Sequence, residues 1–277
     1  MAKPTDADAD VNFELGGRDS MIAGSTVPSS LPYKIVGHRG NPEQFPENSL
    51  AGFKSAAALG LDAIELDVQL TADGVCAVIH DLDTLRTSSQ AMNVALSQFS
   101  EVCAVSVHEP ERFGEQYYPS SIASLKQVCE VLCDFQGLIF IELKEECYAA
   151  ADGAVTGTGR RSDFLNSALA ESEIVAAQRV IISFDEQMIA LAKATDRVPV
   201  GWVMHRYDAR HKAIAEQLQP NFLCVNERKI PTDGSVLWPG DWQWFLYDIV
   251  ESKRALATTQ QGAAFIESWD PSNLARK

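Results

Sequence analysis

Short apolar runs alternate with helix-like segments from Tyr33 onward. Eight of these runs have the length and apolar content of strands buried in a sheet. They cover residues 34–38, 62–68, 138–143, 179–183, 198–203, 222–225, 243–247 and 263–266. Several of the intervening segments carry apolar residues at helical spacing, which favours an α/β fold with parallel strands.

The number of strands predicts the architecture. Eight strands with interleaved helices over about 245 residues fit a (β/α)8 barrel in size and rhythm. A doubly wound open sheet remains the alternative, because periodicity alone does not separate the two folds. Residues 81–120 form a stretch too long for a simple loop, and we expect an insertion there.

Composition divides the chain and limits its partners. Residues 1–31 are polar, with an acidic Asp6-Ala7-Asp8-Ala9-Asp10 stretch, and predict a disordered leader before a barrel domain over 33–275. Acidic residues number 38 against 23 basic ones, which gives a formal net charge of −15. Such a charge repels polynucleotides and anionic membranes, so no nucleic-acid partner is expected.

Targeting signals and cysteine usage favour a cytoplasmic protein. No run of apolar residues is long enough to predict a membrane span, and residues 1–30 lack the basic and apolar regions of a secretory signal. The six cysteines show neither a CxxC pair nor zinc-ribbon spacing. Reduced cysteines are usually buried, so we expect all six in the core. The sequence carries no signal for the oligomeric state.

Two of the strands carry acidic residues on the face opposite their apolar residues. Glu65 and Asp67 share one face of the strand at 62–68, and Glu142 and Lys144 share one face at the end of the strand at 138–143. In a barrel these faces point inward, and three interior carboxylates would form an oxygen-rich site suited to Mg²⁺ or Ca²⁺ and not to zinc. The alternative is a Glu142–Lys144 ion pair with the other two acids solvated at the barrel rim.

Two histidines are expected near these acids. His38 ends the first strand, and His80 follows an apolar run after the turn signal Thr71-Ala72-Asp73-Gly74. A four-residue turn there forms a hairpin in which His80 falls opposite Glu65. Two histidines that converge on three carboxylates suit acid–base chemistry beside a metal ion.

The motifs that carry these residues occur in a fixed order: His38-Arg39-Gly40, Pro46-Glu47-Asn48-Ser49, Glu65-Leu66-Asp67, Asp73-Gly74, His80-Asp81 and Glu142-Leu143-Lys144. Together they resemble the glycerophosphodiester phosphodiesterase family, from about residue 33 to residue 270. The resemblance implies a TIM barrel of the phospholipase C-like phosphodiesterase type, with a small insertion after the second histidine. It also implies metal-dependent hydrolysis of a small-molecule glycerophosphodiester to sn-glycerol 3-phosphate and an alcohol.

The resemblance assigns roles to the inward-facing acids and to the histidines. Glu65, Asp67 and Glu142 match the family's ligands for a divalent cation, here expected to be Mg²⁺ or Ca²⁺. His38 and His80 match its general acid/base pair, although the sequence does not say which histidine is the acid.

Four further residues are expected around the pocket. Arg39 and Lys144 match positions that hold the substrate phosphate and supply the positive charge that this acidic chain needs. Glu47 matches a loop acid near the metal. Asn226, after the sixth strand, is expected to help line the pocket.

The second half of the chain departs from the family's pattern. A late motif of an aromatic residue followed by Thr, Val and Asn appears as Tyr247-Asp248-Ile249-Val250, and a terminal Thr-Asp appears as Ser268-Trp269. These changes fall where substrate alcohols are distinguished, so the head group stays open. The alternatives are a lysophospholipase D-type enzyme, with an apolar groove built by Trp238, Trp242 and Trp244, and a non-catalytic barrel that binds phosphodiesters.

Overall fold

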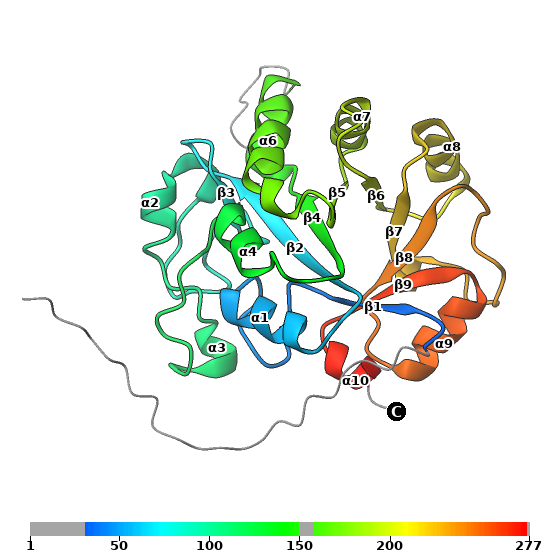
Figure 1. Ribbon diagram of the computed structural model, residues 1–277, viewed down its shortest axis with the longest axis horizontal. Coiled ribbons are helices and arrows are strands. Elements are labelled where there is room, and N and C mark those ends of the chain that lie inside the picture. Colours follow the sequence, from blue (N-terminus) through cyan, green and yellow to red (C-terminus); the bar gives the residue numbers. More distant parts are fainter. Residues whose placement is uncertain (1–30, 150–157, 276–277) are drawn as a thin grey trace, which may run out of the picture.

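A computed structural model describes residues 31–149 and 158–275, so the expected leader, but for its last residue, lies outside the described residues. Eight parallel strands close into a barrel, in the order β1-β9-β8-β7-β6-β5-β4-β2 with β2 paired back to β1 (Figure 1). These strands are β1 (Lys34–Gly37), β2 (Ala63–Leu70), β4 (Leu138–Leu143), β5 (Arg179–Ser183), β6 (Val200–Met204), β7 (Phe222–Asn226), β8 (Gln243–Tyr247) and β9 (Ala263–Ser268). The closure confirms the (β/α)8 prediction and rules out the open sheet.

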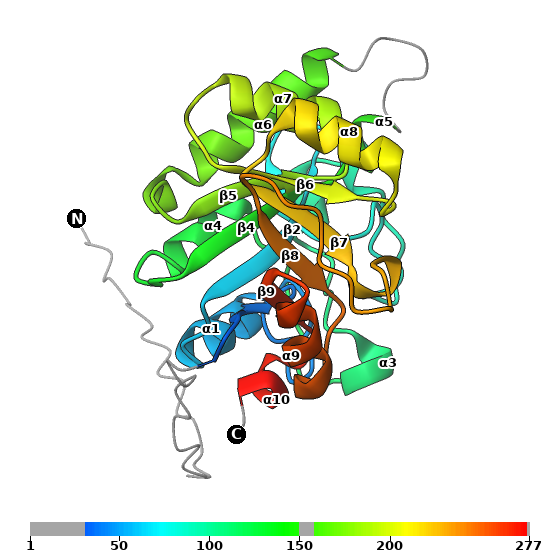
Figure 2. The same ribbon diagram turned by 90° about the vertical axis from the view of Figure 1, so that its right-hand side faces the viewer.

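The helices lie outside the strands, with α6, α7 and α8 along one side of the barrel and α1, α9 and α10 along the other (Figures 1 and 2). The α-helices are α1 (Leu50–Ala58), α2 (Phe99–Val102), α3 (Pro110–Phe113), α4 (Leu125–Val131), α5 (Glu146–Ala149), α6 (Thr158–Glu171), α7 (Glu186–Ala194), α8 (Ala209–Leu218), α9 (Ser252–Gln260) and α10 (Pro271–Ala275). Short 3₁₀ helices are η1 (Val94–Leu96), η2 (Glu173–Val175) and η3 (Glu227–Lys229). No helix among the described residues is long and apolar enough to cross a membrane.

A layer of apolar side chains fills the barrel interior and forms the floor of the pocket described below. Phe140 packs against Phe222 and Phe245, with ring centroids 5.1 and 4.9 Å apart. The same inner cluster contains Phe265. Since side chains two residues apart on a strand share a face, the residues that follow this layer point into the barrel mouth.

The hairpin after β2 corrects one prediction. β3 (Cys76–Val78) runs antiparallel to β2, and Leu70 pairs with Cys76. The turn is therefore one residue longer than expected, and placing His80 opposite Glu65 was wrong. The Thr71 hydroxyl explains the longer turn, because it accepts a hydrogen bond from the backbone N–H of Val75 at 3.0 Å.

The segment between β3 and α4 holds η1, α2 and α3 and has a small apolar cluster of its own. That cluster contains Ala77, Ile79, Val94, Val102, Val107 and Ile122. The segment covers the stretch expected as an insertion, and it brings polar residues to the mouth of the barrel.

The cysteines follow the prediction in part. All six have free thiols, and Cys76, Cys129, Cys147 and Cys224 are buried. Cys103 is half-buried and Cys133 is exposed, so the expectation of six core residues was wrong. Helix α4 ends at Val131, and Cys133 therefore leaves the face on which Cys129 is buried.

Candidate active site

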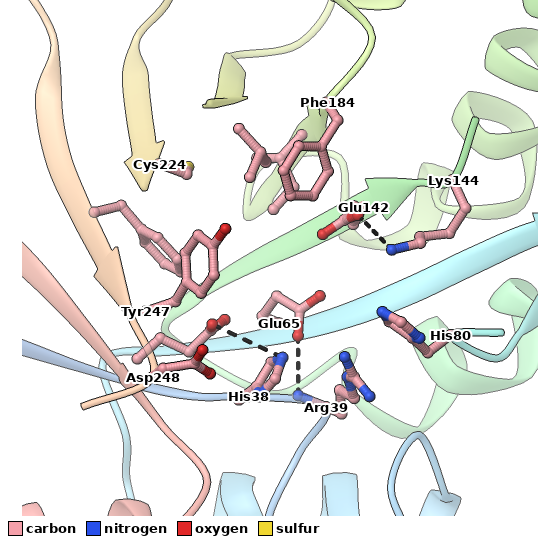
Figure 3. A pocket seen from close by; sticks show the side chains of 14 residues that line it. His38, Arg39, Glu65, His80, Glu142, Lys144, Phe184, Cys224, Tyr247 and Asp248 are labelled. Atoms are coloured by element: carbon pink, nitrogen blue, oxygen red, sulfur yellow. Dashed lines mark hydrogen bonds and ion pairs between the residues drawn. The ribbon is translucent and has the colours of Figure 1, made fainter. Parts of the chain in front are cut away.

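The carboxyl ends of the strands surround a pocket of about 150 Å³. His38 follows β1, Glu65 lies on β2 and Glu142 lies on β4, and their side chains point into the same space (Figure 3). The residues that line the pocket are His38, Arg39, Glu65, His80, Glu142, Lys144, Ile182, Phe184, Val203, Cys224, Phe245, Tyr247, Asp248 and Glu267. Both expected histidines and both side chains expected to bind the phosphate, Arg39 and Lys144, therefore line one cavity.

Strand pairing brings the three expected acids together. Asp67 on β2 is the register partner of Glu142 on β4. Carboxylate oxygens of Glu65, Asp67 and Glu142 all lie within 4.8 Å of one another. The first two acids are only 2% and 1% exposed, so they are not solvated at the rim.

The alternative ion pair forms as well, beside this three-acid cluster. Lys144 Nζ lies 2.8 Å from a carboxylate oxygen of Glu142, as the dashed line in Figure 3 marks. It also lies 3.7 Å from Asp67. Lys144 thus contacts two of the three acids and still lines the pocket, where an anion can reach it.

The surrounding charges stabilise the ionised form of Asp67 but not that of Glu65. Burial would raise the pKa of Asp67, but Arg39 and Lys144 outweigh it and hold that pKa well below its usual range. Burial raises the pKa of Glu65 well above 4.5, and the neighbouring carboxylates Asp67 and Glu267 raise it further. The Oε1 atom of Glu65 is buried and has no hydrogen-bond partner among the described residues. Glu65 is therefore the acid most in need of a counter-charge.

A tight turn after β1 presents Arg39 to the acids. Arg39 has a φ of 53° and Gly40 a φ of 92°, both in the left-handed region. A Cβ at Gly37 would lie 2.3 Å from the carbonyl oxygen of Gly40, so the close approach requires glycine there. The turn lets the Arg39 backbone N–H donate to Glu65 at 2.9 Å, while its Nε lies 3.0 Å from Asp67.

Glu47 lies on the far side of Arg39 and not among the three acids. It accepts a hydrogen bond from Arg39 at 2.9 Å, and Arg86 donates to its two carboxylate oxygens at 2.9 and 2.6 Å. Glu47 is 4% exposed and is therefore held between two arginines. This geometry suits a residue that fixes Arg39 more than a loop acid at a metal ion.

The two histidines differ in their surroundings. His80 Nδ1 lies 2.6 Å from Asp81, whose second oxygen accepts a hydrogen bond from Arg86 at 2.6 Å. His38 packs edge-on against Trp269, with ring centroids 5.0 Å apart. Burial lowers the pKa of His38 well below 6.5, and Arg39 lowers it further, which favours the neutral imidazole. His80 is oriented by a carboxylate, and His38 keeps a free lone pair.

Asn48 is a site residue that the sequence did not indicate in this role. Ser49, and not Asn48, is the N-cap of α1, and its hydroxyl accepts the backbone N–H of Gly52 at 3.0 Å. The amide of Asn48 instead donates to Asp67 at 3.0 Å and accepts the Asp67 backbone N–H at 3.2 Å. Its φ of 54° turns the chain so that the amide reaches β2.

Replacing Asn48 is expected to remove the hydrogen bonds that hold Asp67 in place. Asn48→Ala loses two buried hydrogen bonds and strains a left-handed backbone, and should reduce the free energy of unfolding by about 2–4 kcal/mol. Asn48→Gly accepts the same φ, so it should be about 1 kcal/mol less destabilising while losing the same hydrogen bonds. Divalent-cation affinity, measured by calorimetry, should fall about tenfold in both variants. Equal stability of the two variants would contradict a role for the backbone conformation.

Comparison with known proteins identifies this constellation. A family model described as "Glycerophosphoryl diester phosphodiesterase family" matches residues 38–229, more than half of the chain. The chain belongs to this family. The matched region contains all of the site residues expected from the sequence, from His38 to Asn226.

Curated relatives of this family member match it over part of their length. A glycerophosphodiester phosphodiesterase of Caldanaerobacter subterraneus subsp. tengcongensis is 39% identical over 110 residues, which is 40% of this chain and 44% of the relative. Glycerophosphodiester phosphodiesterase 1 of Bos taurus is 25% identical over 171 residues, which is 62% of this chain and 48% of the relative. The chain thus spans about half the length of the curated relatives it matches.

Solved structures support the fold of this family member over nearly its whole length. An Oleispira antarctica phosphodiesterase in complex with the product sn-glycerol-3-phosphate aligns with a TM-score of 0.72 at 20% identity, over 87% of this chain and 94% of that one. A glycerophosphoryl diester phosphodiesterase described as putative, from Silicibacter pomeroyi, aligns with a TM-score of 0.73 at 17% identity, over 91% and 94% of the two chains.

Two further acids enter the pocket of this glycerophosphoryl diester phosphodiesterase family member, one within and one directly before the late motifs that depart from the family's pattern. Asp248, with a φ of 67°, follows β8, and Glu267 lies on β9. Glu267 is 3% exposed and sits beside His38, with an oxygen 3.9 Å from His38 Nε2. The signal for Glu267 was present, since it follows the inward-facing Phe265 by two residues, but the expected strand ended at residue 266.

Asn226 and the three tryptophans lie outside the set of pocket-lining residues found in the described part of the chain. Asn226 hydrogen-bonds Asp248 and so supports a lining residue from behind. Trp238 stacks on Tyr207 with ring centroids 3.8 Å apart, and Trp244 packs beside both rings. Asn226 is therefore a positioning residue, and these tryptophans pack in and against the main hydrophobic core.

Proposed function

We propose that this chain hydrolyses glycerophosphodiesters to sn-glycerol 3-phosphate and an alcohol, with a divalent cation held by Glu65, Asp67 and Glu142. The observation that carries the proposal is that the three-acid cluster, two histidines and two buried cationic side chains meet at one pocket. Membership of the family supports it, as does the bound sn-glycerol-3-phosphate in the Oleispira antarctica structure.

The donor set fits a divalent cation. All three candidate ligands are carboxylates, the ligands that Mg²⁺ and Ca²⁺ prefer. The buried, unpartnered Oε1 of Glu65 and its raised pKa indicate a missing positive charge. A bound cation would supply charge neutralisation for the phosphodiester oxygens.

The remaining chemistry follows from this chain's own side chains. Arg39 and Lys144 point into the pocket beside the three-acid cluster, and we propose that they bind the phosphate and stabilise the charge that grows in the transition state. The neutral His38 accepts a proton from the nucleophile, which is water or a glycerol hydroxyl. The other histidine returns a proton to the departing alcohol oxygen.

The position of His80 suits it to protonate the leaving alcohol. It lines a second hollow of about 270 Å³, next to the pocket, together with Glu142, Lys144, Phe184 and five residues outside the main pocket: Leu143, Glu145, Glu146, His205 and Lys229. That hollow offers room for the alcohol, and the contact of His80 Nδ1 with Asp81 at 2.6 Å fixes the orientation of the imidazole. We therefore assign the leaving-group proton to His80 and the nucleophile's proton to His38.

The other functions considered have less support. A lysophospholipase D-type enzyme needs an apolar groove at the pocket, and the tryptophans that were candidates for it pack elsewhere in the described structure. A non-catalytic barrel would have no use for the histidine pair. We also propose a cytoplasmic location, which the six unbridged cysteines support.

Release of glycerol 3-phosphate from a mixed set of glycerophosphodiesters tests the function. With Mg²⁺ or Ca²⁺ we expect release that a chelator abolishes and that the metal restores, because the three acids repel the phosphate when no cation is bound. Metal-free and reloaded protein form the matched pair of samples. Release that persists at full rate in chelator, or no release with either metal, would contradict the proposal.

A further inference from the structure

We propose that the pocket holds a second divalent cation, between His38, Glu65 and Glu267. In the described part of the chain two groups of side chains have the spacing of a metal site, and they share Glu65. One is the three-acid cluster. The other uses Glu267, which none of the chemistry above requires, and it reaches the opposite side of Glu65.

The spacing of the second group suits an ion. One ligand atom from each of His38, Glu65 and Glu267 lies within 4.8 Å of the other two, so a single point can lie within about 2.8 Å of all three. His38 Nε2 and the nearest oxygen of Glu267 are 3.9 Å apart, too far for a hydrogen bond. Two ligands about 2.1 Å from one ion, on well-separated sides of it, lie roughly 3.4–4 Å apart.

Unpartnered atoms point to a ligand in the same place. The Oε1 atoms of both Glu65 and Glu267 are buried without a hydrogen-bond partner among the described residues. Both side chains are more than nine-tenths buried and line the pocket. Buried carboxylate oxygens without partners are costly, so their presence on the two strands that flank β1 indicates a group that satisfies both.

The charges around the pocket leave room for two cations. Five carboxylates face two permanent cations, Arg39 and Lys144, a net charge of −3; the five acids are Glu65, Asp67, Glu142, Asp248 and Glu267. One divalent cation leaves −1, and a phosphodiester adds another negative charge. A second divalent cation brings the pocket with its substrate to neutrality.

The ligand types indicate which ions fit. The three-acid cluster offers oxygen alone, whereas the second group combines an imidazole nitrogen with two carboxylates. A mixed set suits a transition ion such as Mn²⁺ or Zn²⁺ better than Mg²⁺ or Ca²⁺. A second ion would take the lone pair that His38 needs as a base, so we expect it to slow hydrolysis when it binds.

Counting bound Mn²⁺ tests the second site directly. The metal-free full-length chain is titrated with Mn²⁺, and free Mn²⁺ is measured by electron paramagnetic resonance. We expect about two ions per wild-type chain and one in Glu267→Gln. Glu142→Gln should retain the second ion alone. Glu216→Gln, at an exposed acid on α8, is the matched control and should retain two.

A spectroscopic measurement keeps the test independent of protein stability. Two Mn²⁺ ions that share a carboxylate lie about 3.5–4 Å apart and couple magnetically. The wild-type spectrum should show this coupling at two equivalents of Mn²⁺, and the Glu267→Gln spectrum should not. One ion per wild-type chain, or two coupled ions in Glu267→Gln, would overturn the inference.

The inference and the proposed function fail separately. A chain that releases glycerol 3-phosphate but binds one Mn²⁺ keeps its function and lacks the second site. A chain that binds two ions but releases no product has the site without the activity. A third outcome is that one ion binds and that Glu267→Gln lowers kcat/KM only for substrates with a cationic alcohol. In that case Glu267 contacts the substrate, and the second-cation proposal is wrong.

Discussion

A His80→Ala variant is expected to lower kcat at least about 100-fold with little change in KM, because the leaving alcohol loses its proton donor. His80 makes no hydrogen bond or ion pair to the three-acid cluster in the described structure, so cation affinity should be unchanged. The measurement is steady-state kinetics on a natural glycerophosphodiester, with cation binding followed by calorimetry.

The leaving group distinguishes the two histidines. An aryl ester such as a nitrophenyl phosphodiester departs without protonation, so the loss in His80→Ala should shrink to about tenfold or less on that substrate. His38→Ala should remain as impaired as on the natural ester. His211→Ala, on α8 and stacked on Trp202, is the matched control and should keep its activity. Equal rescue of both variants would contradict the assignment of acid and base.

Glu65→Gln is expected to change stability and activity in opposite directions. In the metal-free protein it removes a buried charge that lies among other carboxylates, and Gln keeps an oxygen that can accept the Arg39 backbone N–H. Its melting temperature should therefore rise by roughly 2–4 °C for each kcal/mol of relieved repulsion. Its kcat/KM should fall at least about 100-fold, because the cluster loses an anionic ligand.

The difference in stability should depend on pH. Since the folded-state pKa of Glu65 is raised above 4.5, its favourable contribution is present below that value and is lost as the pH rises through the folded-state pKa. The melting temperature of Glu65→Gln should therefore exceed that of the metal-free wild type by an amount that grows from about pH 5 toward pH 8. Asp67 has the opposite shift, and its contribution is already complete above its usual 3.8.

Adding the cation should reverse the order of the two proteins. A ligand at 100 times its dissociation constant stabilises the folded wild type by about 2.7 kcal/mol, while the variant binds it weakly. Thermal melts with chelator and with metal, at several pH values, supply the comparison. The same order under both conditions, or a lead that does not vary with pH, would contradict a cation site at Glu65.

Local patterns were sufficient to predict the barrel and part of the site. Alternation along β2 places Glu65 and Asp67 on the inward face, and the same alternation places Glu142. These positions depend only on strand phase, which a sequence records directly. Every expected strand is present, with bounds that differ by two residues or fewer.

The missed residues depend on contacts between distant segments. Asn48 reaches Asp67 through a left-handed backbone that no local pattern requires. Arg86 meets Glu47 across 39 residues of sequence. Glu267 was not predicted for a different reason. An acidic residue at the end of an apolar run makes the predicted strand end too early. Long-range polar contacts and strand ends were thus the parts that sequence reasoning could not supply.

The ion pairs around Arg39 tie the segment after β3 to the chemistry of the barrel. They run without a break from Asp67 through Arg39, Glu47, Arg86 and Asp81 to His80. Each carboxylate in this series is shared by two cationic or imidazole partners. If the segment is exchanged for that of a relative, the new segment therefore has to supply the same ion-pair partners as well as the right length. A graft has to bring Arg86 and Asp81 together, because Arg86 contacts both Asp81 and Glu47.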